Sequence, residues 1–148
     1  MADLASNRKA RFNYELLEEL EAGIELLGFE VKAVRAGKAS LEGSHVTVRG
    51  GEAYLTGAPI APYQPGNTPK DYEPSRNRRL LLTKKEIDSL SGTEREHRLT
   101  IVPISIYNKG RRIKVRIALA RGKKKYDKRE SIKRREAQRD IRREMKER

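Results

Sequence analysis

The alternation of apolar and polar residues predicts β-strands in much of the chain between residues 12 and 120, after a polar, basic segment at 1–11 that predicts a loosely held arm. Residues 14–27 read YELLEELEAGIELL, and apolar side chains recur at every second position, with Glu18 as the single break. This is the period of a half-buried strand. Leu and Glu favour a helix by propensity, but Gly23 in the middle of the run weakens the helical interpretation, so we predict a strand.

A short helix and a β-hairpin are predicted next. Residues 29–36 carry apolar side chains spaced for one helical face, and Gly37 can supply the left-handed residue that ends the helix. Two alternating runs within residues 45–55 flank Gly50 and Gly51. Two such glycines between alternating runs are typical of a two-residue hairpin turn.

A proline-rich loop and a second helix follow. Residues 57–79 hold five of the six prolines, which predicts a long irregular loop ending in the basic run RNRR at 76–79. Long ordered loops of this kind often carry function. A helix is predicted to begin near Thr83, with Glu86 completing a capping box, and to end at Gly92.

The clearest element is a final hairpin, with strands at 99–107 and 112–120 and a turn at 108–110. We expect one face of the second strand to be apolar and the other to be cationic, through Arg112, Lys114 and Arg116. Several antiparallel strands with short helices predict a mainly β fold. The expected architecture is a small, closed or partly closed barrel.

The end of the chain differs from the rest, which divides the chain into a folded domain at 1–120 and a basic tail at 121–148. The tail holds 14 Lys and Arg against 6 Asp and Glu, a net charge of +8 out of +13 for the whole chain. Its apolar stripe, Ala137, Ile141 and Met145, is too narrow to hold a helix on the domain. We predict a tail that is disordered when free and folds on a partner, with a plain solvated helix as the alternative.

The composition argues against several classes of protein. There is no Cys, so disulfides and thiolate metal sites are excluded. His45 and His97 each stand alone, and we interpret them as surface or edge residues rather than metal ligands. No nuclease-like carboxylate cluster or nucleotide-binding or hydrolase motif is visible, so we expect no enzyme, cofactor or metal. With no signal-like or membrane-spanning apolar run, we expect a cytoplasmic protein with no membrane partner.

The net charge of +13 indicates a nucleic-acid partner, because Lys and Arg side chains that neutralise phosphates release condensed counterions and so favour binding. Aromatic residues are 5% of the chain and there is no Trp. This argues against a reader of splayed single-stranded bases, which needs several exposed rings, and favours recognition of a folded RNA by shape and phosphate geometry. A sequence-tolerant nucleic-acid chaperone and an RNase stay open as alternatives.

Five segments carry a more specific signal. They are NRKARFNYE at 7–15, EAGIELLGFEVKAVRAGKA at 21–39, PYQPGN at 62–67, PSRNRRLLL at 74–82 and KGRRIKVRIALARGKKKYDKRES at 109–131. Each segment is weak alone, but in this order and spacing they resemble the SsrA-binding protein family, also called small protein B, the partners of bacterial transfer-messenger RNA.

The resemblance implies an oligonucleotide-binding-type barrel and a non-enzymatic role in ribosome rescue. The domain would clasp the tRNA-like domain of transfer-messenger RNA and bring it into the A site of a stalled ribosome. The tail would then occupy the decoding centre and fold as a helix in the empty mRNA channel. The implied partners are this RNA, the small ribosomal subunit with its rRNA, and elongation factor Tu through the RNA, with the protein acting as a monomer.

The resemblance also assigns residues by motif. The expected RNA-binding residues of the domain are Asn7, Lys9, Arg11, Glu21, Arg76, Arg78, Arg79, Leu81 and Lys114. The expected residues of the tail in the decoding centre and mRNA channel are Gly122, Lys123, Lys124, Tyr126, Asp127, Lys128, Arg129, Ile132, Lys133 and Arg134. Glu21 is unusual because a carboxylate repels phosphate, so contact with a base or 2′-hydroxyl and a structural role on the strand are equally open. Many members of the family carry His at the position of Tyr126.

Overall fold

The computed structural model describes residues 3–123, and within this range the chain is built mainly from antiparallel strands. The strands are β1 (Asp3–Ser6), β2 (Tyr14–Ile24), β3 (His45–Arg49), β4 (Glu52–Thr56), β5 (Arg78–Leu81), β6 (Thr100–Lys109) and β7 (Arg112–Gly122). The helices are α1 (Arg8–Asn13), α2 (Gly28–Arg35) and α3 (Lys84–His97), with a 3-10 turn at Pro65–Asn67. No helix in this range is long and apolar enough to cross a membrane.

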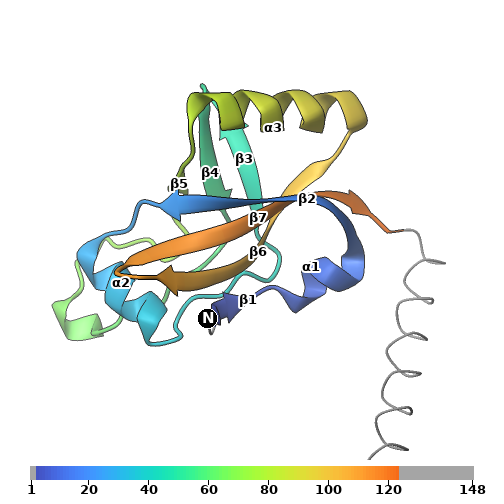
Figure 1. The fold of residues 1–148 in the computed structure, drawn as a ribbon. Coiled ribbons are helices and arrows are strands. Elements are labelled where there is room, and N and C mark those ends of the chain that lie inside the picture. The colour runs from blue at the N-terminus through green and yellow to red at the C-terminus, as the bar shows by residue number, and fades with distance from the viewer. Residues whose placement is uncertain (1–2, 124–148) are drawn as a thin grey trace, which may run out of the picture.

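The strands close into a barrel (Figure 1). Their order is β1-β6-β3-β4-β5-β2-β7, and β6 also pairs with β7, so six strands form a ring. The ring is weakest between β3 and β6, where a single pair, Val46 with Ile101, is in register. The same edge of β6 pairs further along with β1. The predicted mainly β, oligonucleotide-binding-type barrel with short flanking helices is confirmed.

Bulges in two strands divide the apolar residues between two cores. In β2 the register shifts between Leu16 and Glu18, and in β6 it shifts between Pro103 and Ser105. A bulge adds one residue and therefore moves the following side chains to the other face. The barrel interior holds the larger cluster, while a smaller cluster lies under α1, formed by Ala10, Val102, Ile104, Ala118 and Ala120.

The smaller core corrects two expectations. The segment before β2 is not a loose arm, because Ala10 is buried and Asn7 is only 4% exposed. The Asn7 side chain donates to the Pro103 carbonyl at 2.9 Å and accepts from the Ala10 amide at 3.2 Å, which caps α1. The outer face of β7 is likewise not cationic throughout, because the side chains of its second half, Ala118 and Ala120, are buried there.

The local predictions were confirmed at several elements. Residues 14–24 form a strand, and a helix ends just before Gly37, which has φ of +78°. Gly50 and Gly51 join β3 to β4 with φ of +60° and +76°, the left-handed values that a two-residue hairpin turn requires. The capping box of α3 is present, since Thr83 accepts from the Glu86 amide and the Glu86 carboxylate accepts from the Thr83 amide.

Three boundaries were predicted wrongly. Strand β5 was not expected at the end of the proline-rich loop. Helix α3 continues past Gly92 to His97, and Arg98 caps its end with φ of +53°. A single glycine costs a helix only about 1 kcal/mol relative to alanine, so it does not end one by itself. The last turn consists of Gly110 and Arg111, because β6 extends through Lys109.

Candidate nucleic-acid interface

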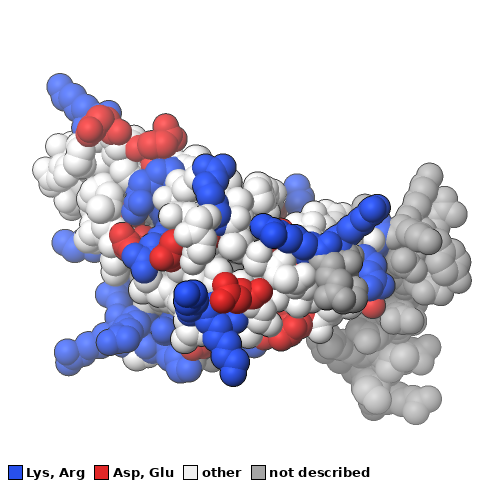
Figure 2. Space-filling model, turned by 90° about the horizontal axis from the view of Figure 1, so that it is seen from above, with Lys and Arg blue, Asp and Glu red and all other residues white. Residues whose placement is uncertain are grey.

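Basic and acidic side chains are interspersed on the face of the molecule seen in Figure 2. Figure 2 shows Lys and Arg projecting from many points of the visible face, with Asp and Glu among them. Several of these cations are already paired: Lys9 with Glu42, Arg116 with Glu19, and Lys109 with Glu21. A phosphate must compete for such cations, so unpaired cations beside an open surface are the stronger candidates.

One groove combines unpaired cations with an open apolar floor, and we call it the basic groove. It has a volume of about 300 Å³ and lies between the end of β2, helix α2, the end of β5 and the β6–β7 turn. Its lining residues are Ile24, Leu26, Val31, Arg35, Leu81, Arg111, Arg112, Ile113 and Lys114. No carboxylate lines this groove, and no described residue forms an ion pair with Arg111, Arg112 or Lys114.

The groove brings together two of the expected RNA-binding residues, Leu81 and Lys114. Leu81 is 49% exposed and therefore presents an apolar surface to the groove. Gly23, its neighbour on β2, allows this placement, because a Cβ at Gly23 would lie 3.1 Å from the Cβ of Leu81. Glycine is therefore favoured at position 23 by close packing rather than by backbone conformation.

The groove also contains residues that the sequence analysis did not single out. Arg35 of α2 donates from its guanidinium to the Arg111 carbonyl at 2.8 Å and to the Asn108 side chain at 3.4 Å. This bond holds the β6–β7 turn against α2 and keeps the guanidinium at the rim of the groove. The sequence signals for these residues were the family segments that contain them, since KGRR at 109–112 holds Arg111 and Arg112 and the segment at 21–39 holds Arg35.

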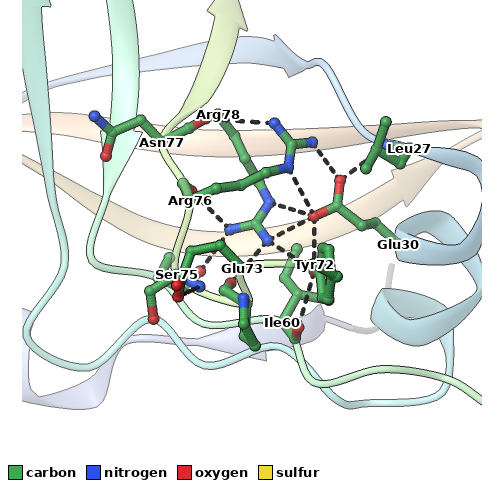
Figure 3. Close-up of polar contacts among 11 residues, drawn as sticks. Leu27, Glu30, Ile60, Tyr72, Glu73, Ser75, Arg76, Asn77 and Arg78 are labelled. Carbon is green, nitrogen blue, oxygen red and sulfur yellow. Dashed lines mark hydrogen bonds and ion pairs between the residues drawn. The ribbon is translucent and has the colours of Figure 1, made fainter. Parts of the chain in front are cut away.

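A buried cluster of polar side chains ties α2 to β5 and to the proline-rich loop (Figure 3). The Glu30 cluster consists of Glu30, Tyr72, Arg76 and Arg78. Both Glu30 and Arg78 are 0% exposed. The Glu30 carboxylate accepts from Arg78 at 2.6 and 2.9 Å, from the Tyr72 hydroxyl at 2.8 Å, and from two nitrogens of Arg76. Leu27 also donates its backbone amide to Glu30, at 2.8 Å.

The bonds of the cluster determine the charge of Glu30. Burial by itself would raise the pKa of this carboxyl, but the hydrogen bonds from Arg76, the Leu27 amide and Arg78 outweigh burial and lower the pKa to about 2. The remaining donors of Arg78 bond the carbonyls of Ala58 and Pro74, both at 2.8 Å. Glu30 is therefore ionised at neutral pH, and with Arg76 and Arg78 the cluster carries one surplus positive charge, which Arg76 presents at 31% exposure.

This cluster corrects the expectation for Arg78. Its side chain is enclosed and bonded at every nitrogen, so it has no surface to offer to a phosphate. Arg76 keeps part of its surface, and Arg79 points outward, where it pairs with Glu52 at 3.0 Å and Glu25 at 3.6 Å. The strand alternation of β5 explains the difference, because Arg78 and Leu80 face inward and Arg79 and Leu81 face outward.

The other expected RNA-binding residues lie outside the groove. Asn7 is buried in the smaller core, and Lys9 is exposed beside it. Arg11 lines a separate hollow with Glu19, Tyr107, Arg116 and others. Glu21 accepts from the Tyr107 hydroxyl and from Lys109 at 3.0 Å, and these two hydrogen bonds lower its pKa. Both carboxylate oxygens of Glu21 thus have partners on the strand surface.

The tail lies almost entirely outside the described residues. Gly122 is the last residue of β7, and the Lys123 amide donates to the Asn13 carbonyl at 2.8 Å. The other tail residues expected to contact the ribosome lie outside the described range: Lys124, Tyr126, Asp127, Lys128, Arg129, Ile132, Lys133 and Arg134. Within residues 3–123, no group of three His, Asp or Glu side chains is placed to hold a metal ion.

The fold and the groove define a class: a small basic barrel of the oligonucleotide-binding type, with a carboxylate-free cationic groove at one side. Comparison with known proteins makes the assignment narrower. Residues 4–147 match the family model described as SmpB protein, and the chain belongs to this family.

Individual relatives agree with the family model. An SsrA-binding protein of Microcystis aeruginosa is 50% identical over 143 residues, which cover 97% of this chain and 93% of the relative. An SsrA-binding protein of Chloroflexus aggregans is 50% identical over 148 residues, covering 100% of this chain and 94% of the relative. A solved structure described as "tmRNA-SmpB: a journey to the center of the bacterial ribosome" aligns with a TM-score of 0.67 at 44% identity, covering 86% of this chain and 92% of the other.

Proposed function

We propose that this chain is an RNA-binding adaptor of trans-translation. The barrel binds the tRNA-like domain of transfer-messenger RNA and delivers it to the A site of a stalled ribosome. Membership of the SmpB family over residues 4–147 supports this proposal most strongly, and relatives of similar length are named SsrA-binding proteins. The role is one of binding, without catalysis, cofactor or metal, and it places the protein in the cytoplasm.

The basic groove is the part of the barrel best suited to grip a folded RNA. Arg35, Arg111, Arg112 and Lys114 can neutralise phosphates without first breaking an ion pair with a described residue. Leu81 can pack against a ribose or an exposed base, and so adds an apolar contact to these charged ones. The Glu30 cluster contributes indirectly, because it fixes α2, which carries Arg35, against β5, which carries Leu81.

The tail supplies the second half of the proposed function. Its residues 121–148 carry a net charge of +8, which suits a channel lined by rRNA phosphates. We propose that the tail occupies the decoding centre and the empty mRNA channel as a helix, and that the barrel acts as a monomer with elongation factor Tu bound to the same RNA. Glu21, Arg11 and Lys9 remain proposed contacts of the barrel.

A gel-shift titration tests the role of the groove. Full-length protein is titrated onto the tRNA-like domain at about 0.15 M salt with excess total tRNA as competitor. Lys114→Ala and Leu81→Ala are expected to weaken binding several-fold, and Lys114→Ala also to lower the salt slope by about 1. Lys85→Ala, an exposed cation on α3 outside the groove, is the matched control. If all three variants lost the same affinity, or if excess tRNA displaced the tRNA-like domain from the wild-type protein, the protein would be a basic RNA binder without selectivity.

A further inference from the structure

The barrel has a second hollow that the basic groove does not include, which we call the β3–β4 hollow. Its volume is about 390 Å³, and it is lined by His45, Thr47, Arg49, Tyr54, Thr56 and Asn77. Because side chains alternate along a strand, Val46, Ala53 and Leu55 face the core while the lining residues of β3 and β4 face outward. The hollow is therefore a feature of the outer sheet surface.

The order of strands separates this hollow from the basic groove. In the ring β6-β3-β4-β5-β2-β7, the pair β3–β4 lies across the barrel from the pair β2–β7. Helix α3 lies across the ends of β3 and β4 rather than along their outer face (Figure 1). The Asn77 side chain points away from the Glu30 cluster (Figure 3). A ligand in the hollow would thus leave the groove and the cluster untouched.

Tyr54 is the central side chain of the hollow. It is in register with Thr47 on one side and with Arg79 on the other. Its ring is partly exposed, and among the described residues none forms a hydrogen bond with its hydroxyl or a ring contact with it. The hydroxyls of Thr47 and Thr56 lie 3.3 Å apart beside the ring and bond each other. A tyrosine with a free face and a free hydroxyl on an open sheet is a platform for a planar ligand.

The charges around Tyr54 favour an anionic ligand. Arg49 is exposed, and no residue of the described part of the chain forms an ion pair with it. Glu52, which lies opposite Arg49 in register, is held by Arg79 at 3.0 Å. Among residues 3–123, no carboxylate lines the hollow. The hollow therefore offers an aromatic ring, one available cation, and hydrogen-bonding groups on His45 and Asn77.

We propose that the β3–β4 hollow binds one unpaired nucleotide of an RNA strand. The base stacks on Tyr54, the adjoining phosphate contacts Arg49, and Asn77 or His45 bonds the base edge or the 2′-hydroxyl. One ring serves one base, so the site agrees with the low aromatic content of the chain. The barrel then holds a folded RNA at the groove and a single-stranded nucleotide on the opposite side.

Photocrosslinking tests this site in the full-length protein. A mixed-sequence octaribonucleotide with 4-thiouridine at one central position is irradiated with the protein, and the crosslinked peptides are mapped by mass spectrometry. This localises binding even though the basic tail also attracts the oligonucleotide. Crosslinks are expected within residues 45–56, and Tyr54→Ala is expected to reduce them by about 5-fold or more, from the usual loss of one base stack. Tyr54→Phe keeps the ring and is expected to retain them.

The controls separate this site from the proposed function. Lys114→Ala weakens binding of the tRNA-like RNA but is expected to leave crosslinks at 45–56 unchanged, while Tyr54→Ala is expected to do the reverse. Arg49→Gln should reduce the same crosslinks, with circular dichroism confirming that each variant is folded. Crosslinks confined to other residues, or equal yield from wild type and Tyr54→Ala, would overturn the proposal and leave this face to a protein partner.

Discussion

Replacing Glu30 by glutamine removes the only negative charge of the Glu30 cluster while keeping the shape of the side chain. In the native structure Glu30 and Arg78 are both fully buried and their charged atoms are 2.6 Å apart. After the change, Arg78 keeps only neutral acceptors, such as the carbonyls of Ala58 and Pro74. The buried guanidinium of Arg78 would then have lost its hydration without the attraction of a carboxylate, which destabilises the folded state.

Two routes give a similar magnitude. The pKa of Glu30 falls from 4.5 to about 2, and at about 1.4 kcal/mol per unit this corresponds to roughly 3 kcal/mol of stability at neutral pH. Removing one partner of a buried ion pair typically costs about 3–5 kcal/mol. We therefore expect Glu30→Gln to lower the free energy of unfolding by about 3 kcal/mol, which corresponds to a fall in Tm of about 10–15 °C.

Urea and thermal unfolding followed by circular dichroism measure this loss. Glu42→Gln is the matched control, because Glu42 pairs with Lys9 at the surface at 3.6 Å. Exposed pairs contribute little, so the control should change the free energy of unfolding by less than about 0.5 kcal/mol. A loss below about 1 kcal/mol for Glu30→Gln would refute the reasoning, since it would mean that Arg78 is stable in the core without its carboxylate.

Three further outcomes follow from the same contacts. The folded-state pKa of Glu30 lies below the unfolded value, so its stabilisation is complete above about pH 4.5 and is lost as the pH falls toward about 2. The free energy of unfolding, measured from about pH 5 to about pH 2, should therefore fall less in Glu30→Gln than in wild type. Gly23→Ala should displace Leu81 and weaken binding of the tRNA-like RNA several-fold in a gel shift while the barrel stays folded; unchanged affinity would show that the position of Leu81 is unimportant. Asn7→Ala should lower stability by about 1–2 kcal/mol in urea unfolding, through loss of the α1 cap and the bond to Pro103, yet retain RNA affinity where the protein is folded; loss of affinity alone would make Asn7 a direct contact.

The period-2 pattern identified β2 correctly but could not show which face each apolar residue occupies. Tyr14, Leu16, Leu20 and Ile24 share one parity in the sequence. The bulge after Leu16 sends the first two to the smaller core and the last two to the barrel interior. A bulge depends on pairing with a distant strand, so no local pattern reveals it.

The sequence could suggest which side chains are exposed on a strand, but it could not show which of them meet a distant partner. Leu81 and Lys114 were expected at an interface, and they line one groove. Arg78 was grouped with its neighbours in the run RNRR, although the fold buries it against Glu30, which lies 48 residues earlier in the chain. An arginine at an inward strand position is favourable only when a carboxylate comes to meet it, and that requires the tertiary structure.

The central claim is that the barrel binds the tRNA-like RNA and that the tail is needed only on the ribosome. One paired experiment tests this claim most directly. A truncation after Lys123 keeps all of β7 and the bond from the Lys123 amide to Asn13. Full-length and truncated proteins are compared for binding to the tRNA-like domain under tRNA competition and for rescue of ribosomes stalled on an mRNA without a stop codon. We predict equal RNA affinity for the two proteins and loss of rescue in the truncation. Loss of RNA affinity on truncation, or full rescue without the tail, would contradict the account.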